Sequence, residues 1–127
     1  MKKYKLFLFT CFGGCATGAA ASKALLRIWE ENPEKMKVAC LPAVPIPAKA
    51  AEIRRNAEKR LLVDACALRC GKKLFDAHGM TADSYIELTS RLKEPKVKRP
   101  ASRELEETVY ALLKKEAGTL LKARKSL

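Results

Sequence analysis

The chain has 127 residues, a formal net charge of +12 and a hydrophobic content of 48%. This length fits one domain whose core needs no disulfide support, and we expect residues 1–127 to form a single α/β domain. Aromatic residues make up only 6% of the chain, so the core depends on aliphatic side chains. No stretch approaches the ~20 apolar residues of a membrane helix, which argues against a membrane partner.

The N-terminal segment predicts a strand followed by a turn. Residues 4–10 are mostly apolar and rich in β-forming side chains, and Gly13, Gly14 and Gly18 follow them. A secretory signal peptide is the alternative interpretation, but Lys5 interrupts the apolar run. The remaining run is at the short end for such a segment. We therefore favour a strand and expect a cytoplasmic protein.

Strands and helices alternate along the rest of the chain. In order, we expect a helix over 19–31, a strand over 37–41, a helix over 48–60, a strand over 61–65, a helix over 67–78, a strand over 85–89, a basic Pro-containing linker over 92–102 and a helix over 103–124. Such alternation predicts a three-layer α/β fold: a four-stranded, mostly parallel sheet with helices on both faces. Right-handed crossovers favour the strand order 2-1-3-4.

Residues 91–127 hold half of the excess positive charge. A basic segment of this kind can attract nucleic acid. However, it contains only one aromatic residue, Tyr110, on which a base could stack. We therefore favour a solvated helix face over a nucleic-acid interface. The sequence gives no oligomer signal beyond the amphipathic last helix.

Five cysteines occupy strand ends or helix starts. Because the carboxyl ends of adjacent parallel strands share one edge of the sheet, we expect their thiols to gather at the topological switch point, where α/β sheets bind ligands. Two pairs, Cys11/Cys15 and Cys66/Cys70, have the spacing Cys-x3-Cys, which differs from the Cys-x2-Cys of zinc ribbons. The five residues are Cys11, Cys15, Cys40, Cys66 and Cys70.

Helix N-termini favour the thiolate form of cysteine, and Lys72 and Lys73 would add positive charge near the third helix. Four thiolates are a typical zinc site, so we expect a metal-binding protein, with zinc preferred over an iron–sulfur cluster. A thiol-based redox or sulfur-relay enzyme using Cys11/Cys15 or Cys66/Cys70 is the alternative. The residues leave open whether the chain is an enzyme. The single histidine, His78, is expected to lie at the surface or cap a helix.

Other chemistries lack their residues. The loop at 12–18 contains no Arg or Lys that could hold an oxyanion, and no Gly-Lys-Ser/Thr sequence ends it. The Cys-x-x-Cys of thioredoxin-like proteins is absent.

The chain resembles the DGC-domain family, whose members are described as zinc-binding. The resemblance spans roughly residues 6–115 and depends on Cys11-Phe-Gly-Gly, on Cys40-Leu-Pro-Ala and on the segment from Asp64 to Leu74. The family's Asp-Gly-Cys motif reads Asp-Ala-Cys here, with Ala65 in place of Gly. The resemblance implies Cys11, Cys40, Cys66 and Cys70 as ligands, with Cys15 as a fifth thiol outside that set.

Overall fold

A computed structural model describes residues 2–122. Within them, four strands form one parallel sheet: β1 (Tyr4–Thr10), β2 (Met36–Val38), β3 (Ala57–Asp64) and β4 (Ser84–Glu87). The order across the sheet is β2-β1-β3-β4, which confirms the predicted order 2-1-3-4.

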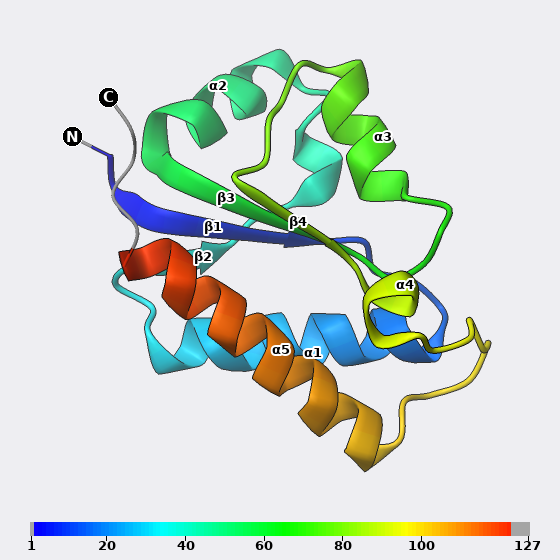
Figure 1. The fold of residues 1–127 in the computed structure, drawn as a ribbon. Helices are drawn as coiled ribbons and strands as arrows, with labels where there is room; N and C mark the ends of the chain where they lie inside the picture. The colour runs from blue at the N-terminus through cyan, green and yellow to red at the C-terminus, as the bar shows by residue number, and fades with distance from the viewer. Residues whose placement is uncertain (1, 123–127) are drawn as a thin grey trace.

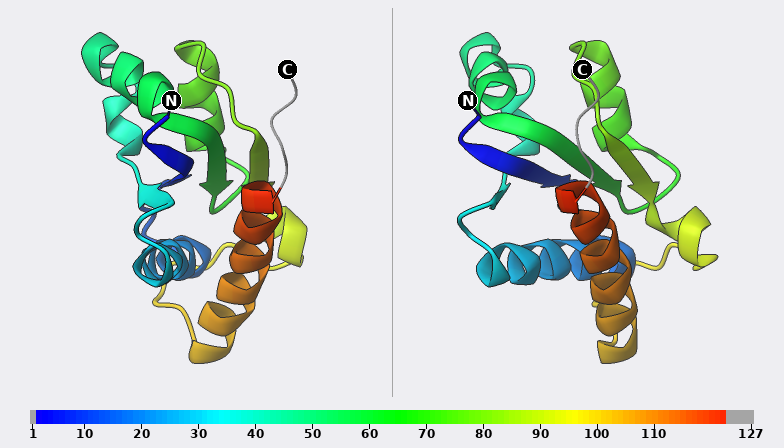
Figure 2. Two further views of the ribbon diagram at one scale, coloured as in Figure 1. Left: turned by 90° about the vertical axis from the view of Figure 1, so that its left-hand side faces the viewer. Right: turned by 60° about the vertical axis from the view of Figure 1, so that its left-hand side comes forward.

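Helices cover both faces of the sheet, as predicted (Figure 1). On one face lie α1 (Ala16–Glu31) and α5 (Arg103–Lys122), and on the other lie α2 (Pro47–Asn56) and α3 (Cys70–Ala77). The two side views in Figure 2 show this three-layer arrangement. A 3-10 turn, η1 (Leu41–Ala43), and a short helix, α4 (Leu88–Leu92), complete the described chain.

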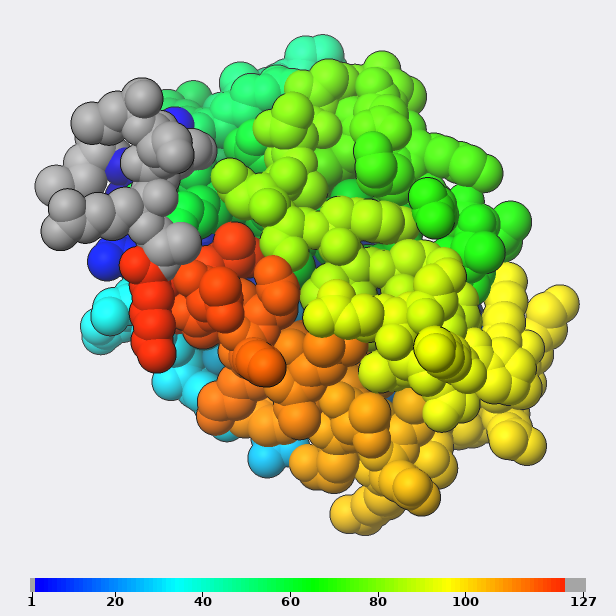
Figure 3. All heavy atoms as spheres, viewed as in Figure 1, coloured from blue at the N-terminus to red at the C-terminus, as the bar shows by residue number. Residues whose placement is uncertain are grey.

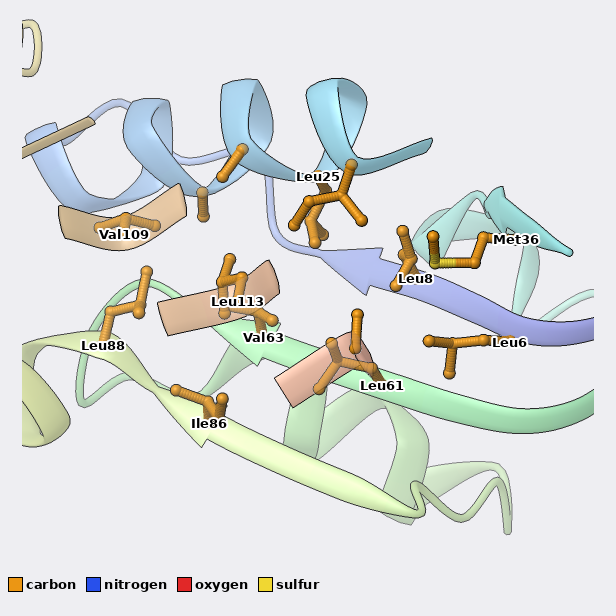
Figure 4. Packing of buried hydrophobic residues seen from close by; sticks show 14 of the residues in the cluster. Leu6, Leu8, Leu25, Met36, Leu61, Val63, Ile86, Leu88, Val109 and Leu113 are labelled. Atoms are coloured by element: carbon orange, nitrogen blue, oxygen red, sulfur yellow. The ribbon is translucent and has the colours of Figure 1, made fainter. Parts of the chain in front are cut away.

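The central strand β1 is apolar on both sides because it is covered on both sides. Leu6 and Leu8 pack in the core beneath α1 and α5, as Figure 4 shows. Phe7 and Phe9 point to the opposite face, where the ring of Phe9 meets that of Phe75 from α3 edge-on, with centroids 5.1 Å apart. Burial on both faces explains why a continuous apolar run, rather than an alternating one, marks this strand.

The largest difference from the predicted elements lies at residues 57–60, which we predicted as the end of a helix and which are strand. There β3 pairs with β1, with Tyr4 opposite Ala57 and Leu6 opposite Lys59. Lys59 is only 5% exposed, and its ammonium donates to the carbonyl of Leu120 at 2.9 Å. Because Lys59 is charged although it lies on a buried face of β3, residues 57–60 lack the apolar pattern that predicts a buried strand.

Other boundaries moved by a few residues. The helix predicted over 19–31 begins at Ala16, and the one over 67–78 begins at Cys70. The strand predicted over 37–41 ends at Val38, and the one over 85–89 ends at Glu87, directly before α4. The last helix begins at Arg103 as predicted, but residues 123 and 124 lie outside the described part of the chain. Within residues 2–122, no helix combines the length and apolar character that crossing a bilayer requires.

Candidate functional site

The loops that follow β1 and β3 lie side by side at the carboxyl edge of the sheet (Figure 1). The two strands are in register to their ends, with Thr10 opposite Val63. The residue after β1 is Cys11, and the backbone N–H of Ala65, directly after β3, donates to its Sγ at 3.4 Å. This contact fixes the Cys11 thiol against the β3 loop, as the parallel topology predicts.

The charges of two further thiols act on Cys11. The pKa of Cys11 is raised above its ordinary value of 9.0, chiefly by burial, and the negative charges of Asp64, Cys70 and Cys66 raise it further. The amide of Ala65 opposes these effects by stabilising the thiolate.

The fully buried carboxylate of Asp64 organises the β3 loop. Its Oδ1 accepts a hydrogen bond from the N–H of Gly71 at 2.8 Å, and its Oδ2 accepts one from the N–H of Lys72 at 3.0 Å. The hydroxyl of Tyr85 on β4 also donates to Oδ2, at 2.9 Å. The last residue of β3 therefore caps the N-terminus of α3, where the helix dipole favours a negative charge.

The hydrogen bond to Asp64 also affects Tyr85. Burial raises the pKa of this phenol, and the bond and charge of Asp64 raise it further. Tyr85 therefore remains a hydrogen-bond donor to the carboxylate well into the alkaline range.

Gly71 permits this close approach of helix and strand. A Cβ at position 71 would lie 2.7 Å from Oδ1 of Asp64 and 2.9 Å from Cδ1 of Leu62. Both distances are shorter than van der Waals contact. Only glycine lets the first turn of α3 approach Asp64 this closely, and that turn contains Cys70.

The connection between Cys66 and Cys70 is a strained turn. Arg69 adopts a left-handed conformation with φ 55° and ψ 45°, which is unfavourable for a residue with a Cβ. Its N–H donates to the carbonyl of Cys66 at 3.1 Å, and its carbonyl accepts from the N–H of Lys73 at 2.9 Å. Strained backbone often occurs at functional sites, and here it sets the separation of two thiols.

The remaining two predicted site residues are placed differently. Cys15 is only 4% exposed. Its Sγ lies 3.5 Å from the hydroxyl of Thr17, which in turn donates to the carbonyl of Ala65 at 2.9 Å. Cys40 is exposed in the loop after β2 and lines a separate cavity beside α2. Within residues 2–122, no group of three or more His, Cys, Asp or Glu side chains is already arranged to hold a metal ion.

An open cleft of about 500 Å³ is lined by Cys66. Its other lining residues come from the β3 loop, from α4 and from Glu94 and Lys96 of the linker 93–102. Figure 3 shows the β3 loop, in green, beside the linker, in yellow. The linker is hydrogen-bonded to the start of α1: the N–H of Ala16 donates to the carbonyl of Val97 at 2.9 Å. The half-buried Cys66 lines this cleft, whereas Cys70 is exposed on the surface.

Three residues that shape the site were not among the predicted site residues. Asp64, Gly71 and Tyr85 are more than five residues apart from one another along the chain and meet only through β3, α3 and β4. One signal was available: Asp64 directly follows the apolar run at 61–63. A buried acid at a strand end needs hydrogen-bond donors. His78, by contrast, lies at the C-terminal end of α3 as predicted.

Comparison with known proteins identifies the class. The family model of the DGC domain matches residues 7–112, and the chain belongs to the DGC domain family. This confirms the resemblance drawn from the cysteine motifs. No curated protein and no solved structure matches the chain.

Proposed function

We propose that the protein binds a thiophilic metal ion, with zinc the best fit, through Cys11, Cys66 and Cys70. The observation that supports this proposal is the electrostatic coupling of these thiols: Asp64, Cys66 and Cys70 all raise the pKa of Cys11 through their negative charge. The negative charges of these groups oppose the ionisation of Cys11. A bound cation removes that opposition and favours the thiolates.

The donor set fits a soft or borderline metal. It consists of sulfur, and sulfur ligands select zinc or copper(I) over magnesium or calcium. Asp64 is a positioning residue in this proposal rather than a ligand, because both of its oxygens already accept hydrogen bonds from α3 and Tyr85. Reduced thiols also suit a reducing compartment such as the cytoplasm, which we propose as the location.

Cys40 is the proposed fourth ligand, as the family motif implies. It is exposed on the loop after β2, the strand that adjoins β1 in the sheet. Three prolines lie close to it in sequence, at 42, 45 and 47. The binding site then has three thiols on the β1 and β3 loops and one ligand on a separate loop. An exchangeable fourth ligand would suit metal sensing or transfer.

The experiment is a count of zinc per chain after anaerobic purification, for the native protein and for single variants. We expect about one zinc per chain, lost in Cys66→Ser and Cys11→Ser. Cys40→Ser should retain zinc but release it faster to a chelator. The matched control is Cys15→Ala, which removes a thiol that is hydrogen-bonded to Thr17. A metal-free native protein, or equal loss of zinc in all variants, would contradict the proposal.

A second candidate is thiol chemistry at Cys66, favoured by its position on the open cleft. In a sulfur relay, the Cys66 thiolate attacks the outer sulfur of a donor persulfide. The donor leaves as a thiol, and Cys66 becomes the persulfide. Incubation with a small-molecule persulfide followed by intact-mass measurement tests this candidate. A gain of one sulfur atom that Cys66→Ser abolishes and Cys15→Ala retains favours the relay.

A further inference from the structure

A second cavity, apart from the loops after β1 and β3, lies beneath α2. It has a volume of about 230 Å³ and is lined by residues of β1, β2, η1 and α2. We propose that it binds a small aromatic anion, such as an aryl carboxylate or sulfonate. The residues that carry this proposal are Lys3, Tyr4, Phe7, Lys37 and Ile53.

The ammonium groups of Lys3 and Lys37 favour an anionic ligand. The ammonium of Lys3 lies 5.6 Å from the centroid of the Tyr4 ring, and that of Lys37 lies 6.0 Å from the same centroid. A third lysine of the lining, Lys49, is paired with Glu52 at 3.4 Å. The excess charge at the cavity therefore comes from Lys3 and Lys37, which converge on one ring. An anion bound beside Tyr4 would lie near both ammonium groups.

The apolar side chains that line the cavity favour a ligand with a flat apolar ring. Phe7 is 5% exposed and Ile53 is 6% exposed, so both are already part of the core beneath α2. The rings of Tyr4 and Phe7 meet at 59° with centroids 5.6 Å apart, which leaves aromatic surface at the cavity wall. Pockets for drug-sized ligands have volumes of roughly 300–1,000 Å³. The smaller volume here fits a single ring with a charged head group.

Coulomb's law gives the size of the electrostatic effect expected for an anion bound close to the two ammonium groups. A unit charge about 6 Å from a lysine, at an effective dielectric of about 40, gains roughly tenfold in binding constant. Two lysines thus discriminate strongly between an anion and a neutral molecule of the same shape. None of the five residues that carry the proposal is a cysteine, but Cys40, the proposed fourth metal ligand, also lines this cavity, so the metal-free chain is used for the test.

The test is a ¹H–¹⁵N correlation NMR titration of the full chain with sodium benzenesulfonate at constant ionic strength. We expect saturable shifts of the amides of Tyr4, Lys37 and Ile53, with a Kd on the order of 1 mM. Benzyl alcohol should bind at least about tenfold more weakly, and benzylammonium should not bind. The variant Lys37→Ala should weaken benzenesulfonate binding by about tenfold. The matched control, Lys98→Ala, removes a lysine of the linker and should leave the affinity unchanged.

Three results would overturn the proposal. The first is shifts that fail to saturate or that spread over lysines elsewhere on the surface. The second is equal affinity for benzenesulfonate and benzyl alcohol. The third is an equal effect of Lys37→Ala and Lys98→Ala, which would indicate general attraction to a basic protein.

Discussion

Replacing Gly71 with alanine tests the geometry that holds the β3 loop. The new Cβ would lie 2.7 Å from Oδ1 of Asp64 and 2.9 Å from Cδ1 of Leu62. Leu62 is fully buried in the sheet, and the Asp64 carboxylate is held by two amides and Tyr85. Neither neighbour can move without losing packing or a hydrogen bond to a charged group.

The cost follows from these two contacts. Overpacking a core costs about 1–3 kcal/mol, and the hydrogen bond from Gly71 to the carboxylate contributes about 1.5–3 kcal/mol. The better helix propensity of alanine returns at most about 1 kcal/mol. We therefore expect Gly71→Ala to lower the free energy of unfolding by about 2–4 kcal/mol.

Urea denaturation of the metal-free protein measures this change, with the slope of the transition as a check that the denatured state is unaltered. The matched control is Gly118→Ala in α5, where no heavy atom lies within 4 Å of the added Cβ. That variant should gain about 0.5–1 kcal/mol in stability. If Gly71→Ala is as stable as the native chain, the close approach of α3 to Asp64 is not required.

Three further predictions concern the same loop. Asp64→Asn should lower the free energy of unfolding by about 2–4 kcal/mol, measured in urea, because an amide nitrogen then faces an N–H or O–H donor. Arg69→Gly should raise it by about 1 kcal/mol by relieving the left-handed conformation, and a loss of stability would contradict the assigned strain. Burial raises the pKa of Cys11 above 9.0, so at alkaline pH the folded chain keeps a proton that the unfolded chain loses. The free energy of unfolding of the metal-free protein should therefore be constant below pH 9.0 and fall as the pH rises from there toward the pKa of Cys11 in the folded chain. Cys11→Ala should flatten this fall in urea midpoints measured across that range.

The sheet could be predicted because its signals are local. Each strand or helix is a separate run of residues, and alternation with right-handed crossovers leaves few topologies. The prediction failed at residues 57–60, where Lys59 lies on the buried face of β3 and bonds to the end of α5. That partner is sixty-one positions away in the chain, so no local pattern could reveal it.

In the candidate site, too, some positions could be predicted from the strand order, whereas others depend on contacts between distant segments. Cys11 lies against Ala65, the residue before Cys66, because β1 and β3 are a parallel pair in register, and strand order alone decides this. The placement of Cys15 depends on Thr17 bonding to the carbonyl of Ala65 across the loop. The late start of α3 depends on Asp64 capping it from the strand. Both are contacts between segments, which composition and periodicity do not encode.

The proposed binding of zinc by Cys11, Cys66 and Cys70 is tested most directly by zinc K-edge X-ray absorption of the purified protein. Our account predicts a first shell of at least three sulfur atoms at about 2.3 Å, reduced in Cys66→Ser and unchanged in Cys15→Ala. A first shell made only of nitrogen and oxygen at about 2.0 Å would contradict it.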